Sequence, residues 1–75
     1  MESVEQAEVL ARFGGRVKAE RESKGLSQER LGFECGLSQT YISEVESGKR
    51  NISLANMYGI AQALGISLAR LVTDV

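Results

Sequence analysis

The chain has 75 residues, of which 43% are apolar and 25% are charged, and its formal net charge is −1. This length allows one domain with a limited core, and the apolar content is too high for a disordered tail. One cysteine, Cys35, and no histidine exclude an intrachain disulfide and the usual zinc ligand sets.

The residue pattern favours an all-α fold, because there is no proline and no alternating strand pattern. The longest apolar run is far too short to span a membrane, and the first ten residues carry glutamates without a basic residue, unlike a targeting peptide. We therefore expect a compact five-helix bundle in the cytoplasm, with no membrane contact, cofactor or metal.

The first helix is expected to end at Lys24, with Gly25 after it in the left-handed C-terminal position. Its apolar face has helical spacing and consists of Leu10, Phe13 and Val17. The pair Gly14-Gly15 weakens the beginning of this helix. Helix one is therefore expected to begin somewhere in residues 4–11, so that residues 1–11 form either an N-terminal extension, as a separate turn or frayed end, or the start of helix one.

Helices two and three are marked by serine N-caps and glycine ends. Ser27 caps the second helix and Gly36 stops it, while Ser38 caps the third helix and Gly48 ends it. Cys35 lies on the inner face of the second helix, where we expect a small buried hydrophobic side chain rather than a redox switch.

Ser53 caps the fourth helix, which ends at Gly65, and Ser67 caps a short fifth helix. The expected core face of the fourth helix is Leu54, Met57, Ile60, Ala61 and Leu64. The fifth helix contributes Leu68, Leu71 and Val72.

The second and third helices are predicted to form a helix-turn-helix. Gly36 permits the sharp bend because it carries no Cβ, and Gly32 leaves room for the two helices to approach closely. Five apolar residues close the angle from inside: Leu31, Cys35, Leu37, Ile42 and Val45.

The outward face of the third helix is short and polar. On a helical wheel it presents Thr40, Ser43, Glu44 and Ser47, with Gln39 at the leading end. Such side chains can pair with base edges in a DNA major groove, although a plain solvated helix face would have the same composition. The basic pair Lys49-Arg50 directly after the helix favours DNA.

From Phe13 to Leu71 the chain resembles the phage-repressor-like helix-turn-helix regulators, the Xre family with a lambda-repressor-like DNA-binding domain. The matching stretches are RVKAERESKGLSQERL and GLSQTYISEVESGKRNISLANMYGIAQALGISLARL. Within that family, TYISEVESGKRNISL is most similar to the controller proteins of restriction–modification systems. The resemblance implies that residues 12–75 form a single DNA-binding domain with a C-terminal dimerisation helix, and that the protein regulates transcription.

The resemblance also implies roles for individual residues. The implied base-contacting residues are Gln39, Thr40, Ser43 and Glu44. The implied contacts to the DNA backbone come from Gln28, Ser38, Tyr41, Lys49, Arg50 and Asn51, with Gln28 also bracing Gln39. Arg21 and Glu46 match a pair that forms an internal salt bridge, which would lock the first helix to the recognition helix.

An apolar strip near the C-terminal end is expected to form a homodimer interface, through Tyr58, Leu68, Val72 and Val75. A two-fold dimer would place two recognition helices about 34 Å apart, one DNA turn, on a near-palindromic operator.

Some features of the second helix are compatible with other partners. Phe33 is expected to pack on the N-terminal extension, and the alternative is a contact patch for a partner protein. Glu29 and Glu34 are either solvated charges or an activating contact with RNA polymerase. The acidic N-terminal segment and Phe33 also fit an antitoxin-like or accessory interaction module, whereas no nucleophile–base pair or phosphate loop indicates an enzyme.

Overall fold

The structure is a computed structural model that describes residues 3–75, and within that range the chain forms five α-helices and no strand. The helices are α1 (Val4–Ser23), α2 (Gln28–Cys35), α3 (Gln39–Glu46), α4 (Leu54–Leu64) and α5 (Leu68–Leu71). The predicted all-α, five-helix architecture is confirmed.

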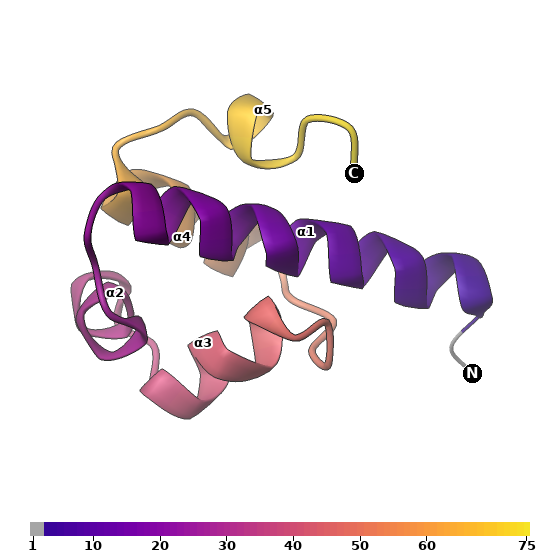
Figure 1. The fold of residues 1–75 in the computed structure, drawn as a ribbon, viewed down its shortest axis with the longest axis horizontal. Helices are drawn as coiled ribbons and strands as arrows, with labels where there is room; N and C mark the ends of the chain where they lie inside the picture. Colours follow the sequence, from indigo (N-terminus) through magenta and orange to yellow (C-terminus); the bar gives the residue numbers. More distant parts are fainter. Residues whose placement is uncertain (1–2) are drawn as a thin grey trace.

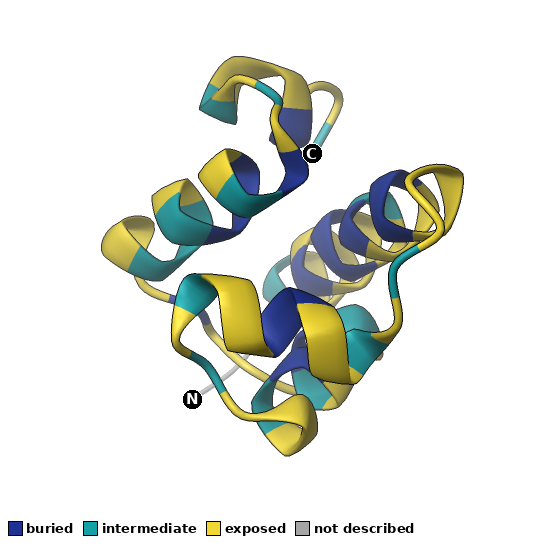
Figure 2. Ribbon diagram, turned by 90° about the vertical axis from the view of Figure 1, so that its left-hand side faces the viewer, coloured by how far each residue is buried: buried dark blue, intermediate teal, exposed yellow. Residues whose placement is uncertain are grey.

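The long helix α1 runs the length of the molecule, which measures 32 × 24 × 20 Å. Figure 1 shows α2 and α3 on one side of α1, α4 behind it, and α5 on the side opposite α3. The buried segments of the helices lie on their inner sides, around a single interior (Figure 2). The core consists of Phe13, Val17, Leu31, Ile42, Val45, Ile52, Ile60, Ala61, Leu64 and Leu71.

Each of the five helices begins after a serine whose hydroxyl accepts a hydrogen bond from the peptide N–H three residues later. The four predicted caps are confirmed, and Ser3 is a fifth, accepting from Gln6 at 3.0 Å. A serine cap stabilises a helix by about 1 kcal/mol relative to alanine. Repeated capping therefore defines the helix starts in a chain whose core is small.

Residues 4–11 form the start of helix one, which is one of the two alternatives expected for residues 1–11, because α1 is continuous from Val4 and passes through Gly14 without a break. Met1 and Glu2 lie outside the described residues. The helix persists at Gly14 because this glycine is buried against α3, so tertiary contact offsets its weak helix propensity. The N-terminal segment is the projecting start of α1 (Figure 1).

Two apolar residues expected inside the molecule are exposed. Leu54 is 65% exposed, because helix side chains lean toward the N-terminus and Leu54 is the first residue of α4. Phe33 is 76% exposed, and the expectation that it packs on the N-terminal extension is wrong, since α2 and the start of α1 lie at opposite ends of the molecule (Figure 1). The guanidinium of Arg30 lies over its ring, 5.4 Å from the centroid.

The short helix α5 is attached to α1 by a buried carboxylate. Glu20 is buried on α1, and its Oε2 accepts a hydrogen bond from Arg70 Nε at 2.9 Å. Arg16 lies 3.8 Å from the same oxygen and donates to the carbonyl of Thr73 at 3.3 Å. These contacts fix the C-terminal segment against α1.

Candidate nucleic-acid interface

The corner between α2 and α3 has the geometry that the glycines predict. Gly36 takes a left-handed conformation with φ 74°, and the N–H of Leu37 donates to the carbonyl of Gly32 at 2.8 Å. A Cβ on Gly32 would overlap the carbonyl oxygen of Leu37. Both glycines are therefore required where the chain turns from α2 into α3.

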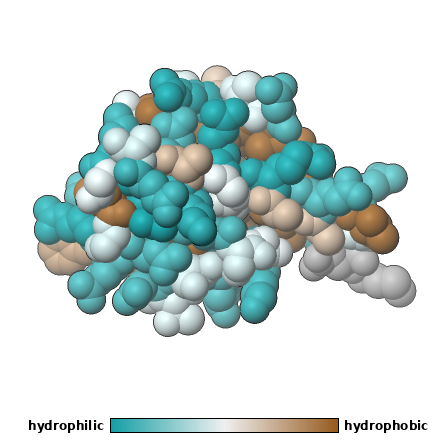
Figure 3. All heavy atoms as spheres, viewed as in Figure 1, coloured by the Kyte–Doolittle hydropathy of each residue, from teal (hydrophilic) through white to brown (hydrophobic). Residues whose placement is uncertain are grey.

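The third helix presents a polar face to solvent. Ile42 and Val45 are fully buried beneath it. The outward residues Gln39, Thr40, Ser43 and Ser47 are exposed, and Glu44 is partly exposed. The lower edge of the molecule, formed by α3, is hydrophilic to neutral in Figure 3. The predicted outward face of this helix is confirmed.

A buried ion pair holds α3 from behind. Arg21 on α1 donates from Nε to Glu46 Oε2 at 2.6 Å and from Nη2 to Oε1 at 3.0 Å. Its Nη1 donates to the carbonyl of Leu26 at 2.7 Å. The two charged side chains are only 10% and 3% exposed. The hydrogen bond that Arg21 donates to the Glu46 carboxylate raises the pKa of Arg21, so the guanidinium stays charged. The predicted structural pair is confirmed.

The side chain of Gln28 joins this buried pair at the end of α3 instead of bonding Gln39 at its start. Its Nε2 donates to Glu46 Oε1 at 3.1 Å, which corrects the expectation that Gln28 braces Gln39. The physical reason is that Glu46 offers a charged acceptor, which binds an amide donor more strongly than a neutral amide does. Gln28 therefore ties the start of α2 to the end of α3.

Glycine also sets the distance between α1 and α3. A Cβ on Gly14 would overlap the carbonyl oxygen of Val45 and lie 2.7 Å from that of Glu46. Gly48 takes φ 75°, and a Cβ there would lie 3.1 Å from the Cα of Ala11. The end of α3 therefore packs directly on the backbone of α1.

The loop after α3 returns to that helix through Arg50. Its Nη2 donates to Glu44 Oε1 at 2.7 Å, and its guanidinium carbon lies 4.6 Å from the centre of the Tyr41 ring. The Tyr41 hydroxyl accepts from Asn56 Nδ2 of α4 at 3.1 Å. The sequence did not reveal the pairing of Glu44 with Arg50, because the turn at Gly48 creates it.

The remaining candidate DNA contacts lie near this cluster. Lys49 and Asn51 are exposed on the loop. The Ser38 hydroxyl accepts from the N–H of Tyr41 at 3.0 Å, so it serves as the cap of α3. The structure thus places Arg50 against the outer side of α3, with Lys49 and Asn51 exposed before and after it in the loop.

The candidate dimerisation residues are unevenly exposed. Tyr58 is 53% exposed and its hydroxyl accepts from Gln62 at 3.1 Å, and Val72 is also exposed. Leu68 and Val75 are half-buried, and Val75 packs against the core. Leu54, one turn before Tyr58 on α4, adds apolar surface that the sequence pattern assigned to the core.

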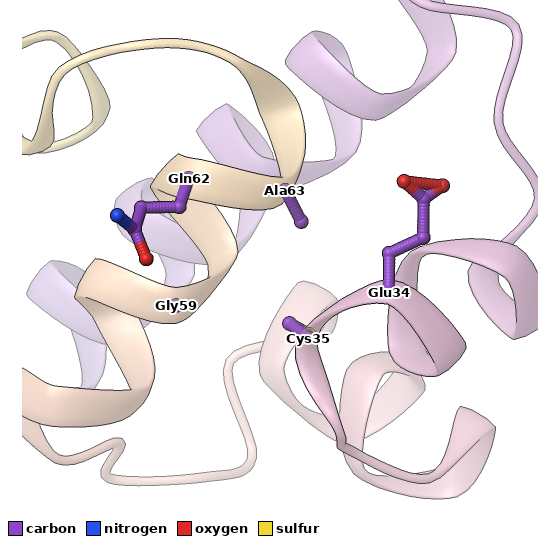
Figure 4. A pocket seen from close by; sticks show the side chains of 5 residues that line it. All are labelled: Glu34, Cys35, Gly59, Gln62 and Ala63. Atoms are coloured by element: carbon purple, nitrogen blue, oxygen red, sulfur yellow. The ribbon is translucent and has the colours of Figure 1, made fainter.

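A shallow hollow of about 440 Å³ lies between α2 and α4, lined by Glu34, Cys35, Gly59, Gln62 and Ala63 (Figure 4). Cys35 is half-buried and packs against the core, as expected for a small apolar side chain. Burial raises the pKa of its thiol. Among residues 3–75 there is no cluster of side chains suited to a metal and no helix long and apolar enough to cross a membrane.

This fold and its exposed helix are those of helix-turn-helix proteins, and a helix-turn-helix family model matches residues 17–71. The chain therefore belongs to the helix-turn-helix family. The DNA-binding domain of the P22 C2 repressor has the same fold, with a TM-score of 0.79 at 27% identity over 83% of this chain and 82% of that one.

Within the family, the chain is similar to controller proteins. It is 53% identical to the control protein C.BamHI of Bacillus amyloliquefaciens over 55 residues, 72% of this chain and 68% of the relative. It is 42% identical to C.MunI of a Mycoplasma species over 69 residues, which covers 91% and 93% of the two chains. The crystal structure of the restriction-modification controller protein C.AhdI from Aeromonas hydrophila has a TM-score of 0.82 at 47% identity, over 83% of this chain and 94% of that one.

Proposed function

We propose that this protein is a sequence-specific DNA-binding transcriptional regulator of the controller type, acting on restriction–modification genes. It binds double-stranded DNA in the cytoplasm and has no catalytic activity of its own. The family match and the similarity to controller proteins support this function.

The observation that carries the proposal is the exposed polar face of α3, fixed from behind by a buried ion pair. Thr40 and Ser43 point to solvent while Arg21 and Glu46 lock the same helix to α1. A helix held rigidly on its inner side and bearing short hydrogen-bonding groups on its outer side suits a major groove.

We assign base reading to Gln39, Thr40 and Ser43, whose side chains are uncharged and exposed. Glutamine can bond an adenine edge in two places, and Thr or Ser can bond either base edge or contact the thymine methyl. Glu44 accepts a hydrogen bond from Arg50, so we do not include Glu44 among the base-reading residues.

Contacts to the DNA backbone are assigned to Lys49, Arg50 and Asn51 on the loop beside α3. Phosphate contacts position the helix without reading sequence. Tyr41 supports Arg50 by stacking, while Gln28 and Ser38 have partners inside the domain and act by holding α2 and α3 in place.

The protein acts as a homodimer on a near-palindromic operator. The exposed apolar side chains Leu54, Tyr58 and Val72 on α4 and the C-terminal segment support self-association, because such side chains gain by leaving water. Two-fold symmetry then places the two copies of α3 in successive major grooves.

Selection of bound duplexes from a random DNA pool tests the proposal. We expect an enriched near-palindrome whose half-sites are centred about 10 base pairs apart. Enrichment of single half-sites would refute the dimer, and failure to enrich any sequence would refute sequence-specific binding.

A protein-interaction role is the second candidate, favoured by the exposure of Phe33. On α2 this ring stands beside Arg30 and the acidic residues Glu29 and Glu34, which would suit RNA polymerase or an antitoxin-like partner. A Phe33→Ser, Glu34→Lys protein that binds the operator as usual but no longer activates transcription would support an RNA polymerase contact. Salt-independent association with a protein, without DNA binding, would support the interaction module.

A further inference from the structure

A cluster of side chains beside the exposed face of α3 fixes the position of Arg50. One guanidinium nitrogen donates to Glu44 at 2.7 Å, and the guanidinium carbon lies 4.6 Å from the centre of the Tyr41 ring. Glu44 and Tyr41 both belong to α3. The recognition helix itself therefore holds the arginine of the following loop.

The cluster places a carboxylate where a DNA-binding surface would gain from positive charge. The helix α3 has no basic residue, and its other carboxylate, Glu46, is bonded to Arg21. The side chains of Arg50 and Glu44 are 46% and 39% exposed, so a phosphate can reach the pair. The N–H of Arg50 Nη2 that donates to Glu44 is not free to donate to a phosphate oxygen.

We propose that Glu44 competes with DNA phosphates for Arg50 and thereby limits the affinity of the protein for its operator. The inference rests on the proposed function. In a loose complex with arbitrary DNA, phosphates are not fixed relative to α3, and Arg50 stays on Glu44. On the operator, base contacts fix α3, and a phosphate beside the loop replaces the carboxylate as the partner of the guanidinium.

The size of the effect follows from the exposure of the pair. Exposed ion pairs favour the bonded arrangement by about two- to five-fold. Removing the carboxylate should therefore tighten binding to the operator by about that factor, because binding no longer has to break the pair, and tighten binding to scrambled DNA by no more than that factor. Because Arg50 can then neutralise one more phosphate on scrambled DNA, the salt slope there should steepen by up to about 0.9, while the operator slope stays unchanged.

The test measures dissociation constants on selected operator and on a scrambled duplex over a range of salt. The proteins are the unsubstituted chain, Glu44→Gln, Arg50→Ala and the double variant, each checked for folding by circular dichroism. We expect Glu44→Gln to bind the operator about two- to five-fold more tightly and to show the steeper scrambled-DNA slope, and the double variant to lose both gains. A change in helix packing alone does not alter how steeply the affinity falls with salt concentration, because that slope counts the phosphates that the protein neutralises.

A matched control is Glu34→Gln on α2. Like Glu44, Glu34 forms an exposed ion pair with an arginine. Its partner is Arg30, whose Nε lies 3.1 Å from Glu34 Oε2. Glu34 lines the hollow that faces α4 (Figure 4), and the same substitution removes the same charge there. We expect its salt slopes to match those of the unsubstituted protein.

Two results would overturn the role of Glu44 while leaving the proposed function intact. One is an equal gain on both DNAs that persists with Arg50→Ala, since simple loss of a negative charge predicts this. The other is a dissociation constant for the operator that is the same in Glu44→Gln as in the unsubstituted protein. If the unsubstituted protein shows no salt-dependent binding to any DNA, the proposed function and the inference fail together.

Discussion

Replacing Arg21 by alanine should destabilise the whole domain rather than merely weaken its contact with DNA. The substitution leaves the carboxylate of Glu46 buried, with its side chain only 3% exposed and only Gln28 still donating to it. It also removes the donor to the carbonyl of Leu26, in the turn between α1 and α2. One change therefore disrupts the attachment of both helix-turn-helix elements to α1.

The expected loss is large relative to the stability of a domain of this size. Breaking a buried ion pair by removing one partner costs about 3–5 kcal/mol. At ordinary stabilities per residue, a chain of 75 residues has about 4–11 kcal/mol in total. Each kcal/mol corresponds to about 4–8 °C in a domain of this size, so Arg21→Ala should lower Tm by at least about 12 °C.

Thermal melting by circular dichroism, followed by gel shift below the measured Tm, checks this prediction. Arg12→Ala is the matched control, because Arg12 on the same helix forms an exposed pair with Glu8 at 3.6 Å. The control should shift stability by less than about 1 kcal/mol. Equal melting temperatures for Arg21→Ala and the unsubstituted protein would refute the structural role of the pair.

The pair should also stabilise the fold over a wide range of pH. The hydrogen bond to Glu46 raises the pKa of Arg21, so the contribution of the pair to folding stability is fully present below the ordinary arginine pKa. That contribution is lost only as the pH rises through the raised value.

Three further predictions follow from other sites. Gly14→Ala should destabilise the domain by about 1–3 kcal/mol in urea melts, because the added Cβ would overlap the Val45 carbonyl. The control Gly15→Ala should be neutral or stabilising, because no atom lies within 4 Å of a Cβ at that position. Cys35 should react with a thiol-alkylating reagent at neutral pH more slowly than an unfolded control, since burial raises its pKa; equal rates would contradict its burial. Thr40→Ala should cost about 1–3 kcal/mol at one operator position, measured on duplexes substituted base by base, and a uniform loss on all sequences would contradict base reading.

Local chemistry made much of the fold predictable from the sequence. Serine N-caps and left-handed glycines act within three or four residues, so Ser27, Gly36 and Ser38 could be assigned without knowing what packs around them. The polar outer face of α3 followed from helical periodicity. The Arg21–Glu46 pair came from the family resemblance, because a contact between residues 25 positions apart leaves no local pattern.

The features that sequence reasoning missed depend on tertiary contacts. Gly14 continues a helix because it fits against the backbone of α3, which helix propensity does not describe. Phe33 is exposed because α2 lies far from the start of α1, and the Glu20–Arg70 contact joins residues 50 positions apart. Spacing along the chain gives no measure of these distances.

The two carboxylates of α3 show why burial, rather than residue type, separates folding from recognition. Glu44 and Glu46 are two residues apart, which places their side chains about 200° apart around the helix. Glu46 faces α1 in a buried pair, so losing its partner removes stability, while Glu44 faces solvent in an exposed pair with Arg50, so exchange of that partner costs little. Substitutions at Glu46 should therefore change the melting temperature, and those at Glu44 should change DNA binding in a protein that remains folded.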